Sequence, residues 1–448
     1  MTKFQKQMLT IAAAGALTAV TALPAMAFEN EFHGLFNIYG DYGNVAATGA
    51  NGNNADSVTA LGKFFSTNSK ADNYIEQRVR LQYIAKASDD LKLVTHFEIN
   101  NRWGFANTVT QSSSTTTGLD VQGSDIDTDG LNIVVKHAYL DVNVAKNLNV
   151  KAGLQAYKDT IGGILVDADL PMVLATTKIG SVGAVVGFSR YGDTTSASTN
   201  TAQLGNQTGN FALADFSYAV NKDSNVGASY YYQSDESTTA TIKKTVNTFA
   251  LNGKTVINGI SLKGFVAMQD GEGTNSTTNY KGYAYNLQAD AKVGVGAAKL
   301  GFLYVSGNTK TGSDNSQFQT LGTTGSTFND GGMMLMVRNN YYYPTSTGYA
   351  MKGNTVSNVQ LAYAGYSAML SDKLKATANL GFGWDNTDVG TTAGTKGDFI
   401  GTEVNAELAY KLYPNLNVYA QAGYISLGSQ YDAYKDPYAV RLGASFSF

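Results

Sequence analysis

Apolar and polar side chains alternate along two neighbouring stretches of the chain, Tyr74 to Lys86 and Leu91 to Trp103. In the first stretch Ile75, Val79 and Leu81 occupy one set of alternate positions, and the charged residues occupy the other. A helix would distribute both sets around its axis, whereas a strand places them on opposite faces. The pattern therefore predicts two strands, each with one apolar and one polar face.

A short polar turn, Ser88 to Asp90, joins these two strands into a hairpin. Their charged faces must match, because a slip of one residue would turn charges toward the apolar side. Placing Arg80 opposite Glu98 and Glu76 opposite Arg102 gives two opposite-charge pairs, each contributing roughly 0.2 to 1 kcal/mol. A shift of two residues loses both pairs, so we predict this register.

The polar face is too charged for the dry core of a soluble sandwich, because buried charges need partners. The apolar face is therefore the one that leaves water. The strand at Leu91 to Trp103 is also longer than the roughly 9 to 11 residues that a tilted strand needs to cross a bilayer. Strands of this kind face lipid on one side and a water-filled lumen on the other.

The same alternation recurs along the chain and gives 18 candidate strands from about Phe32 to Phe448. Short connections, such as those near Ala145 and Asn258, alternate with long ones, such as residues 44–73 and 307–355. Bacterial outer-membrane barrels have tight periplasmic turns and long extracellular loops. The predicted fold is all-β: a closed antiparallel transmembrane barrel of 18 strands, with 16 as the alternative, and one loop folded into the lumen.

Composition agrees with one large barrel. There are 48 glycines and 28 tyrosines against 5 prolines, no cysteine, and no linker dividing the chain. Lys3, Lys6, the apolar run that follows and the small residues Ala25 and Ala27 predict a cleaved signal peptide over residues 1–27, with a single barrel domain over 28–448. The remaining 30 basic and 35 acidic residues give no support for nucleic-acid binding. No other stretch is long and apolar enough for a membrane helix.

The last strand alternates in the same way and ends on Phe448, which resembles the carboxy-terminal signature of outer-membrane barrels. Together with segments such as Gly401 to Tyr410 and Val150 to Gln155, the chain resembles a Gram-negative general porin of 16 or 18 strands. The opening Glu31 to Gly34 is similar to abundant porins of deltaproteobacteria. This resemblance implies a homotrimer in the cell outer membrane, in contact with its lipid and lipopolysaccharide.

Charged residues on the polar faces are the candidates for a pore wall, because charges lining a water-filled pore set ion preference through their local field. The alternative is a set of mutually neutralising pairs that hold the wall in register. Lys136 and His137 both face inward only if the strand contains a bulge; Glu403 and Glu407 fit the pore-wall description as well. The candidates are Glu76, Arg78, Arg80, His96, Glu98, Arg102 and Arg441.

A second candidate region is the segment from Asp159 to Pro171, where glycines and acids interrupt the alternation. The resemblance to general porins implies that this segment folds inward to narrow the channel. Asp159, Asp167 and Asp169 would then face the basic residues of the wall and create a transverse field. The alternative is an ordinary acidic surface loop.

Asp125, Asp127 and Asp129 are spaced as in calcium-binding loops, with Gly130 at the sixth position for the sharp turn. Position twelve is Lys136, where a bidentate glutamate is expected. The two hypotheses for these three aspartates are therefore a calcium site and a solvated acidic loop. We expect no other cofactor.

The sequence gives little support for catalysis, since it contains three histidines and no serine in a Gly-x-Ser-x-Gly turn. The main prediction is a passive diffusion channel for small hydrophilic solutes and ions. A substrate-selective channel or surface receptor is the second hypothesis, and an outer-membrane enzyme is the third.

Overall fold

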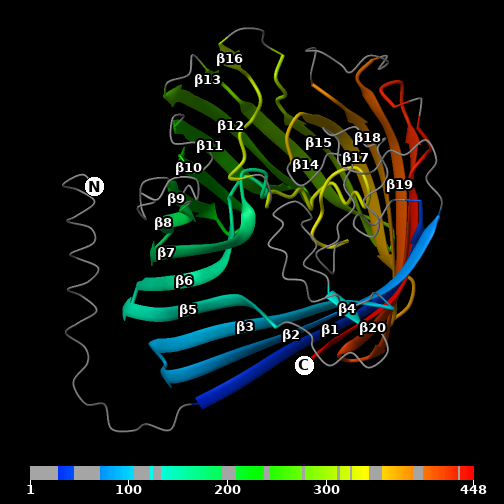
Figure 1. Cartoon of the computed structure of the whole chain (residues 1–448), viewed down its shortest axis with the longest axis horizontal. Coiled ribbons are helices and arrows are strands. Elements are labelled where there is room, and N and C mark those ends of the chain that lie inside the picture. The colour runs from blue at the N-terminus through cyan, green and yellow to red at the C-terminus, as the bar shows by residue number, and fades with distance from the viewer. Residues whose placement is uncertain are drawn as a thin grey trace, which may run out of the picture.

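One closed sheet forms the wall of the molecule and appears as a ring of strands in Figure 1. The first and last strands, β1 (Glu29–Gly43) and β21 (Tyr438–Ser447), pair antiparallel and close it, with Leu35 opposite Ser447. The computed structural model describes residues 29–44, 71–104, 122–124, 133–193, 208–236, 243–274, 278–309, 313–322, 325–342, 356–386, 397–431 and 434–448.

Eighteen of the strands in these residues form the wall, each antiparallel to its neighbours. Three short strands near the long-loop end, β4 (Gln122–Ser124), β13 (Asn279–Tyr280) and β16 (Asp314–Asn315), make only local pairings. The other wall strands are β2 (Asp72–Ser88), β3 (Leu91–Trp103), β5 (Val134–Ala145), β6 (Leu148–Lys158), β7 (Asp167–Ile179), β8 (Val182–Asp193), β9 (Thr208–Asn221), β10 (Ser224–Asp235), β11 (Lys243–Ile257), β12 (Ile260–Thr274), β14 (Tyr283–Val293), β15 (Gly296–Val305), β17 (Val359–Met369), β18 (Leu374–Trp384), β19 (Phe399–Tyr413) and β20 (Leu416–Leu427).

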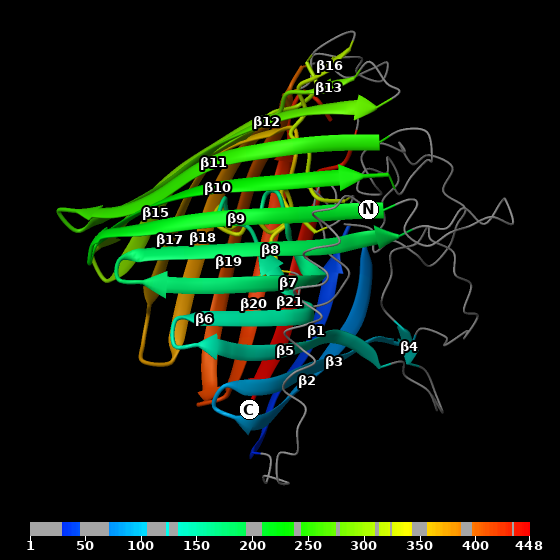
Figure 2. The same ribbon diagram turned by 90° about the vertical axis from the view of Figure 1, so that its left-hand side faces the viewer.

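The predicted closed barrel of 18 strands is confirmed. In Figure 2 tight turns between consecutive strands, such as the β5–β6 and β7–β8 turns, lie at the left-hand end. The predicted hairpin register is confirmed too, because Arg80 is opposite Glu98 and Glu76 is opposite Arg102. Charge pairing and the short turn were sufficient to determine this local register.

The two faces of the wall differ as the alternation predicts. Along β12, Val266 and Met268 are 52% and 67% exposed, while Phe265 and Ala267 beside them are buried. A wall that exposes large apolar side chains on its outer face, with its backbone groups paired in a closed sheet, suits a lipid environment. Within the described residues no helix is long and apolar enough to cross a membrane.

The hydrophobic core lies inside the ring. It consists of side chains from the connection between β6 and β7, from the connection between β15 and β17, and from the strands around them. Ile161, Ile164 and Phe328 are among its fully buried members. The lumen is therefore partly filled by two inward-folded segments, which are both visible inside the ring in Figure 1.

Candidate functional site inside the barrel

The lumenal face of the β2–β3 hairpin carries a connected group of charges. Arg102 Nε donates to Glu76 Oε1 at 2.9 Å, and Arg80 Nε donates to Glu98 Oε2 at 2.5 Å. Arg78 shares Glu98, with 3.3 Å between Arg78 Nη2 and Glu98 Oε1. The cross-strand register places these groups opposite one another, so strand pairing builds the patch.

The seam between β1 and β21 extends this patch. Arg441 Nε and Nη2 donate to Asp41 Oδ2 at 3.0 and 2.8 Å, and the Arg441 guanidinium lies 4.4 Å from the centre of the Tyr39 ring. Tyr39 in turn donates to Glu76 at 2.5 Å. Arg441 Nη1 also donates to the carbonyl oxygen of Tyr342 at 2.5 Å. Arg441 thus connects the barrel seam to a segment inside the lumen.

Exposure divides the predicted pore-wall residues into two groups. The side chains of Arg80 and Glu98 are 24% and 12% exposed, whereas those of Glu76 and Arg441 are completely covered. Arg80 and Glu98 are reachable by a solute, whereas Glu76 and Arg441 are not. The second group holds the wall together, since a fully buried ion pair needs good geometry to offset its desolvation.

The patch contains one more base than acid. Four arginines share three carboxylates, because Glu98 serves both Arg78 and Arg80. The surplus positive charge lies beside the exposed pair of Arg80 and Glu98.

A bulge settles the orientation of Lys136 and His137. His96 is opposite His137, but the next residue, Phe97, is opposite Val135, so Lys136 is the additional residue in β5. Both Lys136 and His137 consequently reach Asp169. A β-bulge re-aims side chains in this way, and it is the condition that the sequence set for both residues to face inward.

The end of the β6–β7 hairpin, residues 155–171, leaves the wall. β5 pairs with β6 only up to Leu154, and β8 pairs with β7 only from Met172 onward, so the residues between pair with each other alone. We call this the hairpin tip. It bends into the ring in Figure 1.

Asp159 organises the turn of the hairpin tip. Its side chain is buried, and its two carboxylate oxygens accept four backbone N–H groups. Gly162 and Gly163 have φ values of 85° and 88°, a conformation that glycine adopts without a steric cost. The N–H groups belong to Ile161, Gly163, Leu165 and Val166, at 2.9, 2.7, 2.7 and 2.7 Å.

The three predicted constriction aspartates do not act as one group. Asp159 faces its own backbone and not the arginines. Asp167 and Asp169 belong to β7 and not to a loop, because β7 begins at Asp167, within the segment where the alternation is interrupted. Asp169 contacts Lys136 and His137, and Asp167 accepts from Lys158 Nζ at 2.9 Å. The cause is the bend in the hairpin, which rotates its outer face toward the lumen.

A second inward segment, residues 306–342, connects β15 toward β17. Glu403 of β19 anchors it, because its carboxylate accepts the N–H groups of Met334 at 2.5 Å and of Met336 at 2.7 Å. On the opposite side Lys263 Nζ of β12 donates to Asp330 at 2.7 Å. We call these residues the crossing segment, since they are fixed to walls on both sides.

Only indirect signals for the crossing segment are present in the sequence. Glu403 and Glu407 fit the pattern of pore-wall charges, but both bind this segment instead: Glu407 accepts from Tyr341 at 2.6 Å. The run Met333 to Val337 is fully buried. Five consecutive apolar residues in a polar connection were the available signal that the connection folds inward.

The hairpin tip and the crossing segment bind each other. Leu321 N donates to Leu165 O at 2.9 Å, and Thr327 N donates to Gly163 O at 2.9 Å. The hydroxyl of Thr327 donates to Asp167 at 2.5 Å. Together the two segments form a single structure that narrows the lumen.

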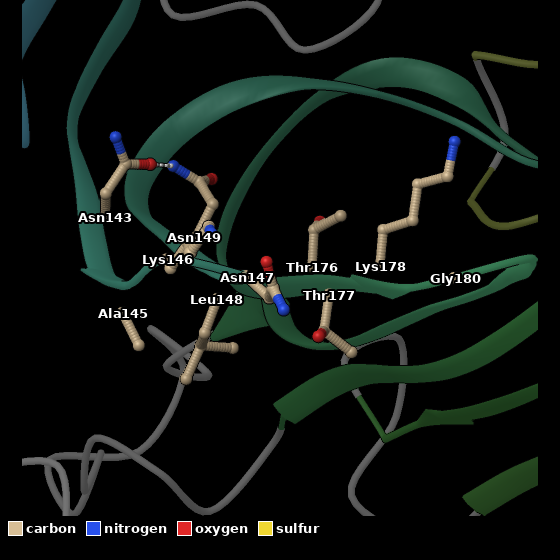
Figure 3. A pocket seen from close by; sticks show the side chains of 10 residues that line it. All are labelled: Asn143, Ala145, Lys146, Asn147, Leu148, Asn149, Thr176, Thr177, Lys178 and Gly180. Atoms are coloured by element: carbon tan, nitrogen blue, oxygen red, sulfur yellow. Dashed lines mark hydrogen bonds between the residues drawn. The ribbon is translucent and has the colours of Figure 1, made fainter.

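Other candidate sites contribute less. The predicted calcium ligands Asp125, Asp127 and Asp129 lie outside the described residues. In the part of the chain that the structure describes, no group of three or more acidic, histidine or cysteine side chains is arranged to hold a metal ion. A pocket between the β5–β6 and β7–β8 turns is lined partly by Lys146 and Lys178 (Figure 3), and none of its lining residues is an acid.

Solved structures share this architecture across the whole chain. OpdL of Pseudomonas aeruginosa is 12% identical, with a TM-score of 0.57 over 94% of this chain and 99% of its own. OccK9 (OpdG) of the same organism is 14% identical, with a TM-score of 0.57 over 93% and 97%. This chain has their barrel fold. OccAB4 of Acinetobacter baumannii is 12% identical, with a TM-score of 0.53 over 95% and 100%.

The similarity is one of fold and not of sequence. No protein-family model matches the chain, and no curated protein matches it in sequence. The structure titled as the outer membrane protein opdK of P. aeruginosa also covers 94% of this chain, at 12% identity and a TM-score of 0.54. Because the identities are low, individual residue roles in this chain must be argued from its own contacts.

Proposed function

We propose that the protein is an outer-membrane channel through which small hydrophilic solutes and ions diffuse passively. The observation that carries this proposal is the closed barrel with an apolar outer face and a charged, partly exposed inner face. Such a wall is compatible with lipid outside and water inside. The channel would perform no chemistry and need no cofactor, since its selectivity comes from width and field.

The hairpin tip and the crossing segment would set the width. Thr160 of the hairpin tip donates its N–H to Tyr231 Oη of β10 at 3.1 Å, and Glu403 of β19 binds the crossing segment, so the narrowing is a rigid part of the barrel. A solute that passes the narrowed lumen must be small or must lose part of its hydration shell. The exposed pair of Arg80 and Glu98, with the surplus charge of Arg78, would act on ions that approach this region.

The protein's export and assembly form part of the same proposal. Residues 1–27 would direct export and be removed, and the barrel would contact outer-membrane lipid and lipopolysaccharide. A homotrimer is proposed from the resemblance to general porins. Chemical cross-linking of the protein in native outer membranes, followed by gel electrophoresis, should yield a species of three chains, and a single-chain species alone would refute the trimer.

Reconstitution in a planar bilayer tests the channel directly. We expect stepwise conductance increases as single molecules insert, and a nonzero reversal potential in a potassium chloride gradient. Folding is checked separately by the change in gel mobility on heating in detergent. Correctly folded protein that inserts into vesicles but passes no ions would refute the proposal.

The anchored narrowing favours a second candidate, a channel selective for particular solutes. A rigid constriction held by the same core that fills the lumen presents fixed donors and acceptors to a solute, as a binding site does. Saturable block of the ion current by a small solute would support selectivity. Ion current that remains proportional to salt and unaffected by candidate solutes would support the general channel.

A further inference from the structure

Two histidines from neighbouring strands face each other in the lumen. His96 on β3 and His137 on β5 are directly opposite in the register, and their Nδ1 atoms are 3.2 Å apart. His137 is 12% exposed, so the pair lies at the lumen surface and not in the sealed core. The bulge at Lys136 produces this pairing, because it turns His137 to the same face as His96.

Asp169 determines which nitrogen of His137 is free. Its Oδ1 is 2.9 Å from Nε2 of His137. Nε2 therefore carries the proton that it donates to this carboxylate, and Nδ1 of the neutral ring presents a lone pair toward His96. The Nδ1–H group of a neutral His96 donates to this lone pair in the 3.2 Å contact, and a bound metal ion would take the place of that proton.

The separation of the two nitrogens suits a metal ion. Zinc–imidazole bonds are about 2.0 to 2.1 Å long. Two such ligands are therefore about 3.3 Å apart in a tetrahedral site and about 2.9 Å apart at a right angle, by the geometry of those bond lengths. The observed 3.2 Å lies between these values. The contact of Asp169 with Nε2 matches the carboxylate that usually orients a metal-binding histidine.

We propose that His96 and His137 bind a divalent transition-metal ion in the lumen, with Asp169 positioning His137. Two imidazoles favour copper, zinc and nickel over magnesium and calcium. Because the protein supplies only two ligands, water or an anion in the lumen completes the coordination. The site is therefore open and its binding is reversible.

Neighbouring charges leave room for a bound cation. Lys136 is paired with Asp169, and Arg80 is paired at 2.5 Å with Glu98, which Arg78 shares, so the two bases nearest the histidines each have an acidic partner. A metal ion adds two positive charges close to Arg80. If the protein is the channel proposed above, this charge strengthens the local preference for anions.

The test uses the full mature protein without a polyhistidine tag, refolded in detergent, with zinc chloride as the probe. Isothermal titration calorimetry should show about one zinc ion per chain. His96→Ala and His137→Ala should each weaken binding at least tenfold, since each removes one of two protein ligands. His33→Ala is the matched control, because His33 is the remaining histidine and lies on β1, separated from His96 by Gln82 of β2.

Asp169→Asn separates positioning from ligation. It keeps both imidazoles but weakens the contact that orients His137, and the loss of a comparable outer partner typically costs about 10- to 100-fold in metal affinity. In bilayers, zinc should shift the reversal potential toward the chloride value for wild type and His33→Ala, and chelation should reverse the shift.

Calorimetry tests the metal site and electrophysiology tests the channel, so each proposal can be refuted without the other. Binding that is absent from wild type, or unchanged in both His96→Ala and His137→Ala, would overturn the metal site whether or not the protein conducts. Binding that depends on both histidines in a protein that conducts no ions would uphold the metal site and refute the channel proposal.

Discussion

Glu403 is the residue on which the position of the crossing segment most depends. It is completely buried, and its two oxygens accept N–H groups from three consecutive residues, Met334, Leu335 and Met336. Asn405 donates to the same carboxylate at 2.8 Å. In Glu403→Gln one oxygen becomes an NH₂ group, which cannot accept these donors and meets them head-on.

The size of the effect follows from those contacts. A buried donor left without its acceptor costs about 1 to 3 kcal/mol, and hydrogen bonds to a charged group are the stronger ones. Losing one or two such bonds costs about 3 kcal/mol. Because 1.4 kcal/mol corresponds to a factor of ten, the population of molecules with a displaced crossing segment should rise roughly 100-fold.

Single-channel recording measures that population. We expect Glu403→Gln to fold into a barrel and to show larger conductance or frequent steps to a larger conductance, because the segment no longer stays across the lumen. Glu29→Gln, at an exposed position on β1, serves as the matched control and should match wild type. A Glu403→Gln channel with wild-type conductance and no additional steps would refute the anchoring role.

Three further changes test the wall and the hairpin tip. Glu98→Gln removes the acid shared by two arginines, so the reversal potential should shift toward the chloride value while folding persists. Arg441→Met leaves a buried carboxylate without its partner and should destabilise the barrel by about 3 to 5 kcal/mol in urea unfolding, whereas Arg190→Met, at a 44% exposed position, should have little effect. Asp159→Ala leaves four backbone donors without an acceptor, and protease cleavage within the hairpin tip should become faster. An unchanged reversal potential in Glu98→Gln, unchanged urea unfolding in Arg441→Met, or an unchanged cleavage rate in Asp159→Ala would contradict the corresponding prediction.

Strand positions and the β2–β3 register could be predicted because they depend on local information. Alternation with a period of two identifies a strand wherever one face meets lipid, and two charge pairs such as Arg80 with Glu98 select the register of a short hairpin. The bulge at Lys136 was only a conditional expectation, since two adjacent polar residues can share a face only where the strand is irregular, and the structure contains that irregularity.

The interior of the barrel was less predictable because it depends on contacts between residues distant in sequence. Asp159 looked like a charge facing the lumen, yet it binds the backbone of its own turn. Glu403 looked like a pore-wall residue, yet it holds Met334 about seventy positions earlier in the chain. Composition and spacing do not reveal whether a carboxylate meets water, an arginine or a backbone donor.

The sequence by itself determined the barrel: its strands, its closure and the side of each strand that faces lipid, because these follow from the repeated exchange of apolar and polar side chains. Only the tertiary structure decided how the lumen is narrowed and which charges remain reachable. The physical reason is that the ring brings β12, β19 and β21 around one space, and the segments that fill that space are held by partners from several strands at once.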